Sequence, residues 1–220
     1  MSRPIVTAIL MSWKRQPNMP RIVSALRNQT VPVEIWLINN LDFKDFGADR
    51  LIAFPWAPDS AGEWARYPIS ARAETEYVMF QDDDWLIGDD EFVEDAMAEQ
   101  FVMCPDNILG VSGRGLQSRP PYYHPDIDDG YAAIVKGHFQ IFRADMTRRI
   151  RLPRLEVSSD IYWSLDAGGG QPVHWISKDL SDRLVELPRR GVGYEFRPGH
   201  YQEREEVCKA WLNESVGVMA

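Results

Sequence analysis

The chain has 220 residues, enough for one well-packed domain and short for two. Its net charge of −9 argues against broad binding to a nucleic-acid backbone, although it leaves room for a local basic patch. No apolar run has the length of a membrane span, and the first run, residues 5–11, is too short for a signal peptide. Cys104 and Cys208 show neither metal-ligand spacing nor a disulfide framework, so a reducing cytoplasm is the expected compartment.

The first 40 residues predict a βαβ unit. Buried strands are expected at Ile5–Met11 and Val33–Ile38. Between them, Asn18 is the expected N-cap of a helix with Pro20 in its first turn. The apolar face of that helix is Met19, Ile22, Val23 and Leu26. Such a unit crosses over right-handed and builds a parallel sheet.

Residues 51–112 continue the alternation of strands and helices. A third strand is expected at Leu51–Phe54, followed by a helix to about Thr75 with a capping box at Ser60 and Glu63. A buried strand at Tyr77–Phe80 comes next. Asp89-Asp90 then opens a helix whose predicted apolar stripe is Phe92, Val93, Ala96, Met97 and Phe101, and a strand at Ile108–Ser112 follows.

After residue 113 the chain is richer in loops. Strands are expected at Tyr131–Val135, Gly137–Phe142 and Val173–Ile176. A short helix at Ile161–Leu165, capped by Ser158 or Ser159, ends at Gly168-Gly169-Gly170. A last helix is expected over Glu203–Leu212. The pattern predicts one α/β domain over residues 1–220, with a nucleotide-binding half at about 1–112 and an acceptor-binding half at about 113–220.

The most informative stretch is Tyr77–Leu86, in which an apolar strand runs into Asp82, Asp83 and Asp84. Open α/β sheets bind ligands at this end of their strands. If the extended geometry persists, Asp82 and Asp84 point to one side and Asp83 to the other. Two carboxylates about 4 Å apart repel by about 4 kcal/mol at an effective dielectric constant of roughly 20, and a divalent cation would offset this. The alternative is a solvated acidic turn that caps the next helix.

In their order, the motifs resemble those of GT-A fold glycosyltransferases, especially the family-2-like and exostosin-like branches. Ser12-Trp13-Lys14-Arg15 is similar to their first-strand S/T-Y-N-R segment, and residues 18–30 resemble the helix that follows it. Residues 38–42 resemble their V-D-N/D-G-S turn, with Asn39 where Asp is usual, which leaves the nucleotide base open. Residues 80–84 resemble the D-x-D motif. Ser159-Asp160 resembles a late acidic pair that lacks its first acid, and His200 resembles a C-terminal metal-binding histidine. His138 and His174 are competing candidates for that ligand, although packing is the favoured role of His174, between Val173 and Trp175.

This resemblance implies a Rossmann-like, mostly parallel sheet flanked by helices in one domain. It implies transfer of a hexose-type sugar from a nucleotide diphosphate sugar to an acceptor hydroxyl, with Mn²⁺ or Mg²⁺ as cofactor. A UDP-sugar is the favoured donor. By the same resemblance Asp84 binds the metal with His200, while Asp82 and Asp83 contact ribose and sugar. Asp160 is the expected catalytic carboxylate: a general base in an inverting enzyme, or an acceptor-orienting and charge-stabilising group in a retaining one.

The expected donor-binding residues lie in both halves of the chain. Guanidinium forks suit phosphate, which makes the arginines among them candidates for the diphosphate. The full set is Ser12, Trp13, Arg15, Asn39, Asn40, Asp42, Arg66, Arg72, Asp82, Asp83 and Arg204. Four aromatic residues are either an acceptor platform or core: Tyr122, Tyr123, Trp163 and Trp175.

Two other functions are compatible with these patterns. A nucleotidyltransferase can use a similar sheet, but Ser12–Pro17 lacks the glycine-rich, lysine-containing loop expected of one. A sugar- or metal-binding module without turnover is the second. The acceptor stays open between a glycan, a small molecule and a hydroxymethylated DNA base. Phages carry small enzymes of the type resembled here, so a phage-encoded protein in the host cytoplasm is one expectation, with a basic cleft at Arg148, Arg149, Arg151 and Arg154.

Overall fold

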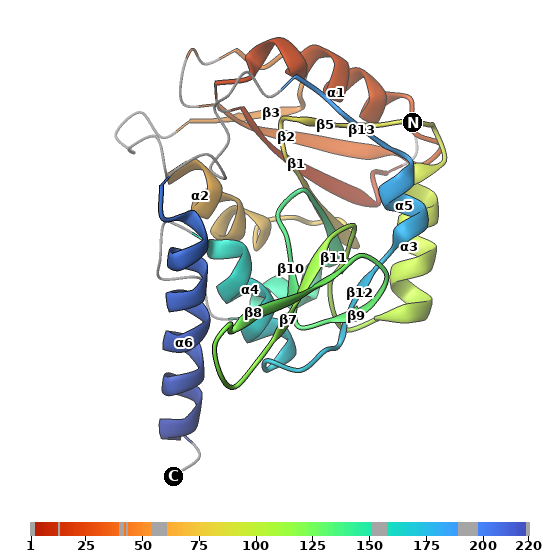
Figure 1. The fold of residues 1–220 in the computed structure, drawn as a ribbon. Helices are drawn as coiled ribbons and strands as arrows, with labels where there is room; N and C mark the ends of the chain where they lie inside the picture. The colour runs from red at the N-terminus through yellow and green to blue at the C-terminus, as the bar shows by residue number, and fades with distance from the viewer. Residues whose placement is uncertain are drawn as a thin grey trace.

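The computed structural model describes residues 3–12, 14–39, 42, 44–53, 61–150, 158–188 and 198–218. A central β-sheet with helices on both faces forms the body of the molecule, and the last helix runs along one side of it (Figure 1). The predicted α/β fold is confirmed. Residues from both halves of the chain contribute strands to this one sheet, as expected of a single domain.

The central sheet is mostly parallel. In the described part of the chain its eight strands are ordered β3 (Arg50–Ile52), β2 (Val33–Asn39), β1 (Val6–Ser12), β4 (Tyr77–Gln81), β11 (Phe139–Arg143), β6 (Leu109–Gly110), β12 (His174–Ile176) and β9 (Gly130–Ala132). Neighbours pair in parallel from β3 to β4. Strand β11 is antiparallel to both β4 and β6, β12 is parallel to β6, and β9 closes the edge antiparallel. The C-terminal ends of β1, β2 and β4 therefore share one edge.

The two faces of the sheet are covered by different helices. Helices α1 (Met19–Arg27), α3 (Phe92–Met103) and α5 (Lys178–Asp182) pack on one face, whose core includes Ala8 and Leu10 of β1. Helices α2 (Ala61–Ser70) and α4 (Ser159–Gly168) pack on the other, whose core includes Ile9 of β1. Because side chains alternate along a strand, the apolar run of β1 supplies both faces.

Smaller elements surround the sheet. Strands β7 (Gly113–Leu116), β8 (Tyr123–Ile127) and β10 (Ile134–Val135) form a second sheet, while β5 (Trp85–Ile87) pairs with β13 (Leu184–Glu186). Two short 3-10 helices are η1 (Gln16–Asn18) and η2 (Ala144–Arg148). Helix α6 (His200–Val218) packs on α4, and the Glu205 carboxylate accepts hydrogen bonds from the backbone N–H of Tyr122 and Tyr123 at 2.5 and 3.0 Å.

Several local predictions were wrong in detail. The strand predicted at 131–135 is split between β9 and β10, which belong to different sheets. Phe101 is 62% exposed rather than part of the apolar stripe of α3. The side chains of Asn18 and Ser158 make no capping hydrogen bond. Strands β5, β7, β8 and β13 and helix α5 were not predicted, because they are short and their sequences mix polar and apolar residues without a clear period. The proposed capping box at Ser60 and Glu63 and the end of the third predicted strand, Phe54, lie outside the residues whose side chains are described.

In the described residues, no helix combines the length and apolar character that crossing a membrane requires.

Burial of His174 gives the fold a pH dependence. The imidazole is fully buried in β12; its Nδ1 accepts from the backbone N–H of Ile108 at 3.3 Å, and its Nε2 lies 2.8 Å from the carbonyl oxygen of Ser164. With both bonds the ring is a neutral Nε2–H tautomer. Burial lowers the pKa of His174 from 6.5 to about 4, and the bond to Ser164 opposes this only in part. Packing, not metal binding, is the role of this histidine.

We expect acid to destabilise the fold through His174. Below pH 6.5 His174 takes up a proton in the unfolded chain, whereas in the folded chain it does so only near pH 4. The free energy of unfolding therefore falls as the pH falls across that window. The slope reaches roughly 1.4 kcal/mol per pH unit, and the total is about 3 kcal/mol. Urea unfolding of wild type and His174→Gln between pH 7 and pH 4 measures it. The variant should show the shallower dependence, and equal slopes would contradict the assignment.

Candidate active site

The three consecutive aspartates form a turn at the ligand-binding edge of the sheet. They follow β4 directly, and the ends of β1 and β2 lie alongside, with Ser12 in register with Asn39. Both Ser12 and Asn39 are buried. The tertiary structure therefore gathers at one edge the ends of three strands that lie far apart in the sequence, at Ser12, Asn39 and Gln81.

Arg15 binds two of the three carboxylates. Its Nη1 lies 2.6 Å from Oδ1 of Asp83 and 3.4 Å from Oδ2 of Asp84, and all three side chains are at least nine-tenths buried. The expected alternation of the three aspartates across an extended strand is wrong, because β4 ends at Gln81 and the chain turns there. Asp83 and Asp84 therefore converge on Arg15, while Asp82 pairs with Arg66. Lys14, just before Arg15, has a φ of 57°, a left-handed conformation uncommon for a residue with a side chain. This strained residue helps to direct Arg15 towards the turn.

The backbone of the acidic turn is held from all sides. The Asp82 N–H donates to the carbonyl of His138 at 3.1 Å, and the Leu187 N–H donates to the carbonyl of Asp84 at 2.7 Å. The amide of Asn18 donates to the carbonyl of Asp83 at 2.8 Å, which is the reason that it does not cap α1. Three segments distant in sequence thus fix the backbone of the turn that carries the carboxylates.

Asp82 pairs with a different cation. Nη1 of Arg66, a nearly fully buried residue of α2, lies 3.0 Å from Oδ1 of Asp82. Desolvation raises the pKa of Asp82, and the neighbouring Asp160 carboxylate adds to the rise, although Arg66 opposes both. Gly137 leaves room for this pair, since a Cβ at that position would lie 2.7 Å from Nη2 of Arg66. Asp82 is thus paired with Arg66, separately from the two carboxylates that Arg15 binds.

Asp160 lies in the first turn of α4 and is held by Arg204. The carboxylate is 1% exposed, and both terminal nitrogens of Arg204 lie 3.2 Å from its Oδ2. Arg204 also donates to the hydroxyl of Tyr123 at 2.8 Å and, through Nε, to Nε2 of His200 at 3.0 Å. Burial raises the pKa of Tyr123 to about 12, so its hydroxyl stays protonated. Ser158, which precedes α4, adopts a φ of 56°, a second strained residue beside the site.

Not every predicted residue reaches this edge. Arg72 is exposed in the turn that enters β4, at the opposite end of that strand from the acids. Asp42 reaches its own loop, where it accepts from Asn39 and Gln16 at 2.9 Å each. Its hydrogen bonds to Lys44 and Asn39 lower the pKa of Asp42. Trp13 and Asn40 lie outside the described residues.

The basic cleft proposed for a DNA acceptor is not at this edge in its described part. Arg148 and Arg149 are exposed in and just after η2, which follows β11 at the N-terminal end of β4. Arg151 and Arg154 lie outside the described residues.

The four aromatic residues do not form one platform. Trp163 is core, with its ring 4.9 Å from Tyr67 and 5.5 Å from Phe142. Trp175 packs against Tyr131 on the edge of the sheet. Tyr123 is 5% exposed, covered by guanidinium groups on its ring.

Sequence analysis missed several residues of the site. Among them are Asn18, Arg114, Lys136 and Gly137. His138, a competing candidate for the metal ligand, packs its ring on Trp85 with centroids 5.3 Å apart. The signal of Lys136 and Gly137 was weak, because the lysine separates two predicted strands and the glycine begins the second of them. Only the antiparallel pairing of β11 with β4 brings this segment beside the aspartates.

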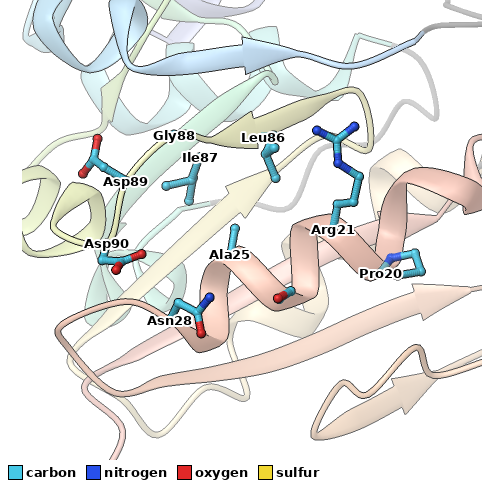
Figure 2. A pocket seen from close by; sticks show the side chains of 10 residues that line it. Pro20, Arg21, Ala25, Asn28, Leu86, Ile87, Gly88, Asp89 and Asp90 are labelled. Atoms are coloured by element: carbon cyan, nitrogen blue, oxygen red, sulfur yellow. The ribbon is translucent and has the colours of Figure 1, made fainter.

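A separate groove of about 520 Å³ lies between α1 and β5 (Figure 2). Its lining runs from Pro20 and Arg21 along Ala25 to Asn28 on the helix, and over Leu86 to Asp90 on the other wall. Asp89 at one end is paired with Arg183 at 2.6 Å. None of the three clustered aspartates lines it, so this groove is not the candidate site.

The donor groups of the acidic turn suit a hard divalent cation. Carboxylate oxygens are the ligands that Mg²⁺ and Mn²⁺ prefer, and Asp83 and Asp84 already converge on one positive charge. A cation held by Asp84 would complete its shell with ligand oxygens, as Mg²⁺ does where few protein groups bind it. Metal binding by His200 through Nε2 would require its bond from Arg204 to open. Within the described residues, no three His, Cys, Asp or Glu side chains gather as a preformed metal site.

Solved glycosyltransferase structures resemble this chain in fold. Residues 1–349 of S. aureus TarS in complex with UDP-GlcNAc match with a TM-score of 0.60 at 14% identity, covering 92% of this chain and 66% of TarS 1–349. A second crystal structure of S. aureus TarS 1–349 matches with a TM-score of 0.56 at 15% identity, covering 79% of this chain and 58% of TarS 1–349. The mannosyltransferase PcManGT from Pyrobaculum calidifontis, in complex with GDP-Man and Mn²⁺, matches with a TM-score of 0.58 at 15% identity, covering 87% of this chain and 59% of its own.

The chain has the GT-A fold. This confirms the fold that its motifs predicted. The chain spans less than two thirds of each of these three chains. No protein-family model matches the sequence, and no curated protein is similar to it. In this GT-A fold, the acidic turn, Arg15 and Asp160 lie together at the carboxyl edge of the sheet, where α/β proteins bind their ligands.

Proposed function

We propose that this chain is a glycosyltransferase that moves a sugar from a nucleotide diphosphate sugar to an acceptor hydroxyl, with Mn²⁺ or Mg²⁺ as cofactor. A UDP-sugar is the favoured donor. One observation carries the proposal: two buried carboxylates converge on Arg15 at the end of β4, and the adjacent Asp82 pairs with the buried Arg66. A diphosphate brings negative charge, so a site for it needs cations held in fixed positions. Arg15 and Arg66 meet that need at this edge.

The fold neighbours support the choice of donor. TarS is described in complex with UDP and with UDP-GlcNAc, and PcManGT with GDP-Man and Mn²⁺. Both are proteins with the fold of this chain, at 14–15% identity. The shared fold supports a nucleotide-sugar donor, while the sugar and the base have to be measured.

The proposed transfer assigns a task to each buried charge. The bond between the sugar C1 and the diphosphate oxygen breaks and its electron pair leaves with the diphosphate, while the acceptor oxygen bonds to C1 and loses its proton. A divalent cation held by Asp84, with His200 as the predicted second ligand, would neutralise the leaving diphosphate as a Lewis acid. Arg15 and Arg66 supply fixed positive charge beside it.

The proposal assigns Asp160 to the acceptor. In an inverting enzyme its carboxylate takes the acceptor proton, and in a retaining enzyme it orients the acceptor and stabilises positive charge on the sugar. Arg204 keeps that carboxylate in position through two contacts of 3.2 Å. The hydroxyl of Tyr123 and the ring of His200 fix Arg204 in turn.

A panel of nucleotide sugars tests the proposed function. We expect one UDP-sugar to raise the melting temperature with Mn²⁺ present and to raise it much less with EDTA. At a ligand concentration of about 100 Kd, the shift should be roughly 5–10 °C for a chain of this size. Release of UDP in the presence of Mn²⁺ measures turnover.

The panel includes GDP-mannose and the free nucleotides as comparisons. A shift with a GDP-sugar alone would correct the base. Binding of a donor without release of nucleoside diphosphate, with any acceptor, would favour the module without turnover. No shift with any nucleotide sugar would overturn the proposal.

A further inference from the structure

A basic cluster lies on the acceptor side of Asp160, formed by Arg114, Lys136 and Arg204. These cations come from β7, from the turn after β10 and from α6. The guanidinium groups of Arg114 and Arg204 lie 5.0 and 5.3 Å from the centre of the Tyr123 ring. Arg204, which holds Asp160, and Arg114 thus share the Tyr123 ring, and Lys136 joins them through Asp126, the carboxylate that it shares with Arg114.

The cations of this cluster contact two carboxylates. Asp126, which is 54% exposed, pairs with Arg114 at 2.5 Å and with Lys136 at 3.3 Å, while Arg204 pairs with Asp160. Two cations thus share the single exposed carboxylate of Asp126, in a chain of net charge −9. Desolvation lowers the pKa of Lys136, and repulsion from Arg114 and Arg204 lowers it further, although Asp126 opposes the shift.

A purely structural role accounts for only part of this arrangement. Arg114 and Asp126 are directly opposite on β7 and β8, so a cross-strand ion pair explains that contact. It does not explain Lys136, a second cation placed against the first and 22% exposed. The position of Lys136 in the chain suggests another role, because Gly137, the next residue, lies against Arg66 and Asp82. The lysine is therefore one residue away from the donor side of the site.

We propose that Arg114 and Lys136 bind an anionic group of the acceptor, a phosphate or a carboxylate, which lies near the hydroxyl that receives the sugar. The proposal rests on the proposed function. The exposed carboxylate of Asp126 shows how an anion sits between the two cations, and an acceptor anion would share or replace it. The donor diphosphate is assigned to other cations, Arg15 and Arg66, which pair with the aspartates of the acidic turn.

Binding of small hydroxylated anions tests this site. Isothermal titration is done with glycerol 3-phosphate, glycerate and glycerol, each in the presence of UDP and Mn²⁺ so that the donor phosphate site is filled. We expect both anions to bind and glycerol not to bind. Lys136→Gln should weaken the anions about tenfold, the effect of one lost charge-assisted contact. Arg143→Gln is the matched control, because Arg143 is also a partly exposed cation paired with one carboxylate, Glu76 at 2.9 Å, at the opposite end of the sheet.

The outcomes separate this proposal from the proposed function. Binding of glycerol 3-phosphate alone would narrow the acceptor anion to phosphate, and Lys136→Arg should restore most of the affinity. Equal weakening by Lys136→Gln and Arg143→Gln, or anions that bind no better than glycerol, would overturn the acceptor site. If UDP does not bind to wild type but the Lys136 effect persists, the anion site stands and the donor assignment is wrong.

Discussion

Asp84→Asn is expected to lower metal-dependent hydrolysis of the donor by about 10²–10³-fold, the usual cost of one well-placed electrostatic group. The substitution keeps the shape of the side chain but removes the charge that would hold the cation. Stability should change by less than about 1 kcal/mol, because the weaker contact to Arg15, at 3.4 Å, is lost together with the repulsion from Asp83. Release of nucleoside diphosphate is measured over a range of Mn²⁺ concentrations.

Asp83→Asn separates binding of metal from binding of Arg15. Asp83 makes the shorter contact, 2.6 Å to Arg15, and both side chains are buried. Breaking a buried ion pair costs about 3–5 kcal/mol, so this variant should lose more stability than Asp84→Asn and show less change in Mn²⁺ dependence. Asp90→Asn, an exposed acid outside the site, controls for the change in net charge. Unchanged Mn²⁺ dependence in Asp84→Asn would show that another group holds the metal.

Asp160→Asn should reduce turnover by about 10²–10⁴-fold, the contribution typical of a positioned acid or base. Donor affinity should stay within about twofold, because Asp160 faces the acceptor side and the diphosphate cations are Arg15 and Arg66. The measurements are UDP release under saturating donor and the Kd of the donor. A variant with full turnover would remove Asp160 from the reaction.

Arg204→Gln tests whether Arg204 acts through Asp160. It leaves a carboxylate that is 1% exposed without its cation, a change expected to cost about 3–5 kcal/mol. Turnover should fall in this variant, while Arg204→Lys should restore part of it. If Arg204 instead bound the diphosphate, as the sequence suggested, donor affinity would fall first and the double variant with Asp160→Asn would show independent losses.

Much of the site was within reach of the sequence because its signals are local. An apolar strand that runs into three aspartates marks the carboxyl edge of a buried parallel strand, and Arg15 follows the first strand in the same way. Asp160 was named from the resemblance of Ser159-Asp160 to a late acidic pair, since an acid at the start of a helix is by itself an ordinary cap. The pairing of the charges was not visible. Which aspartate meets Arg15 and which meets Arg66 depends on the turn after Gln81. Hydrogen bonds donated by Asn18 and Leu187, and one donated to the carbonyl of His138, set the geometry of this turn.

By itself the sequence determined the α/β class, the positions of the first strands along the chain and the position of the acidic turn. Hydrophobic periodicity and strand-end chemistry are properties of short segments, so they can be recognised without the fold. The tertiary structure alone decided the rest. It placed Arg204 on Asp160 across 44 residues through the docking of α6, and it brought Lys136 near Arg114 through the antiparallel pairing of β10 with β7. Contacts between segments apart in sequence leave no periodic trace in the chain, so the pairing of these charges is a product of the fold.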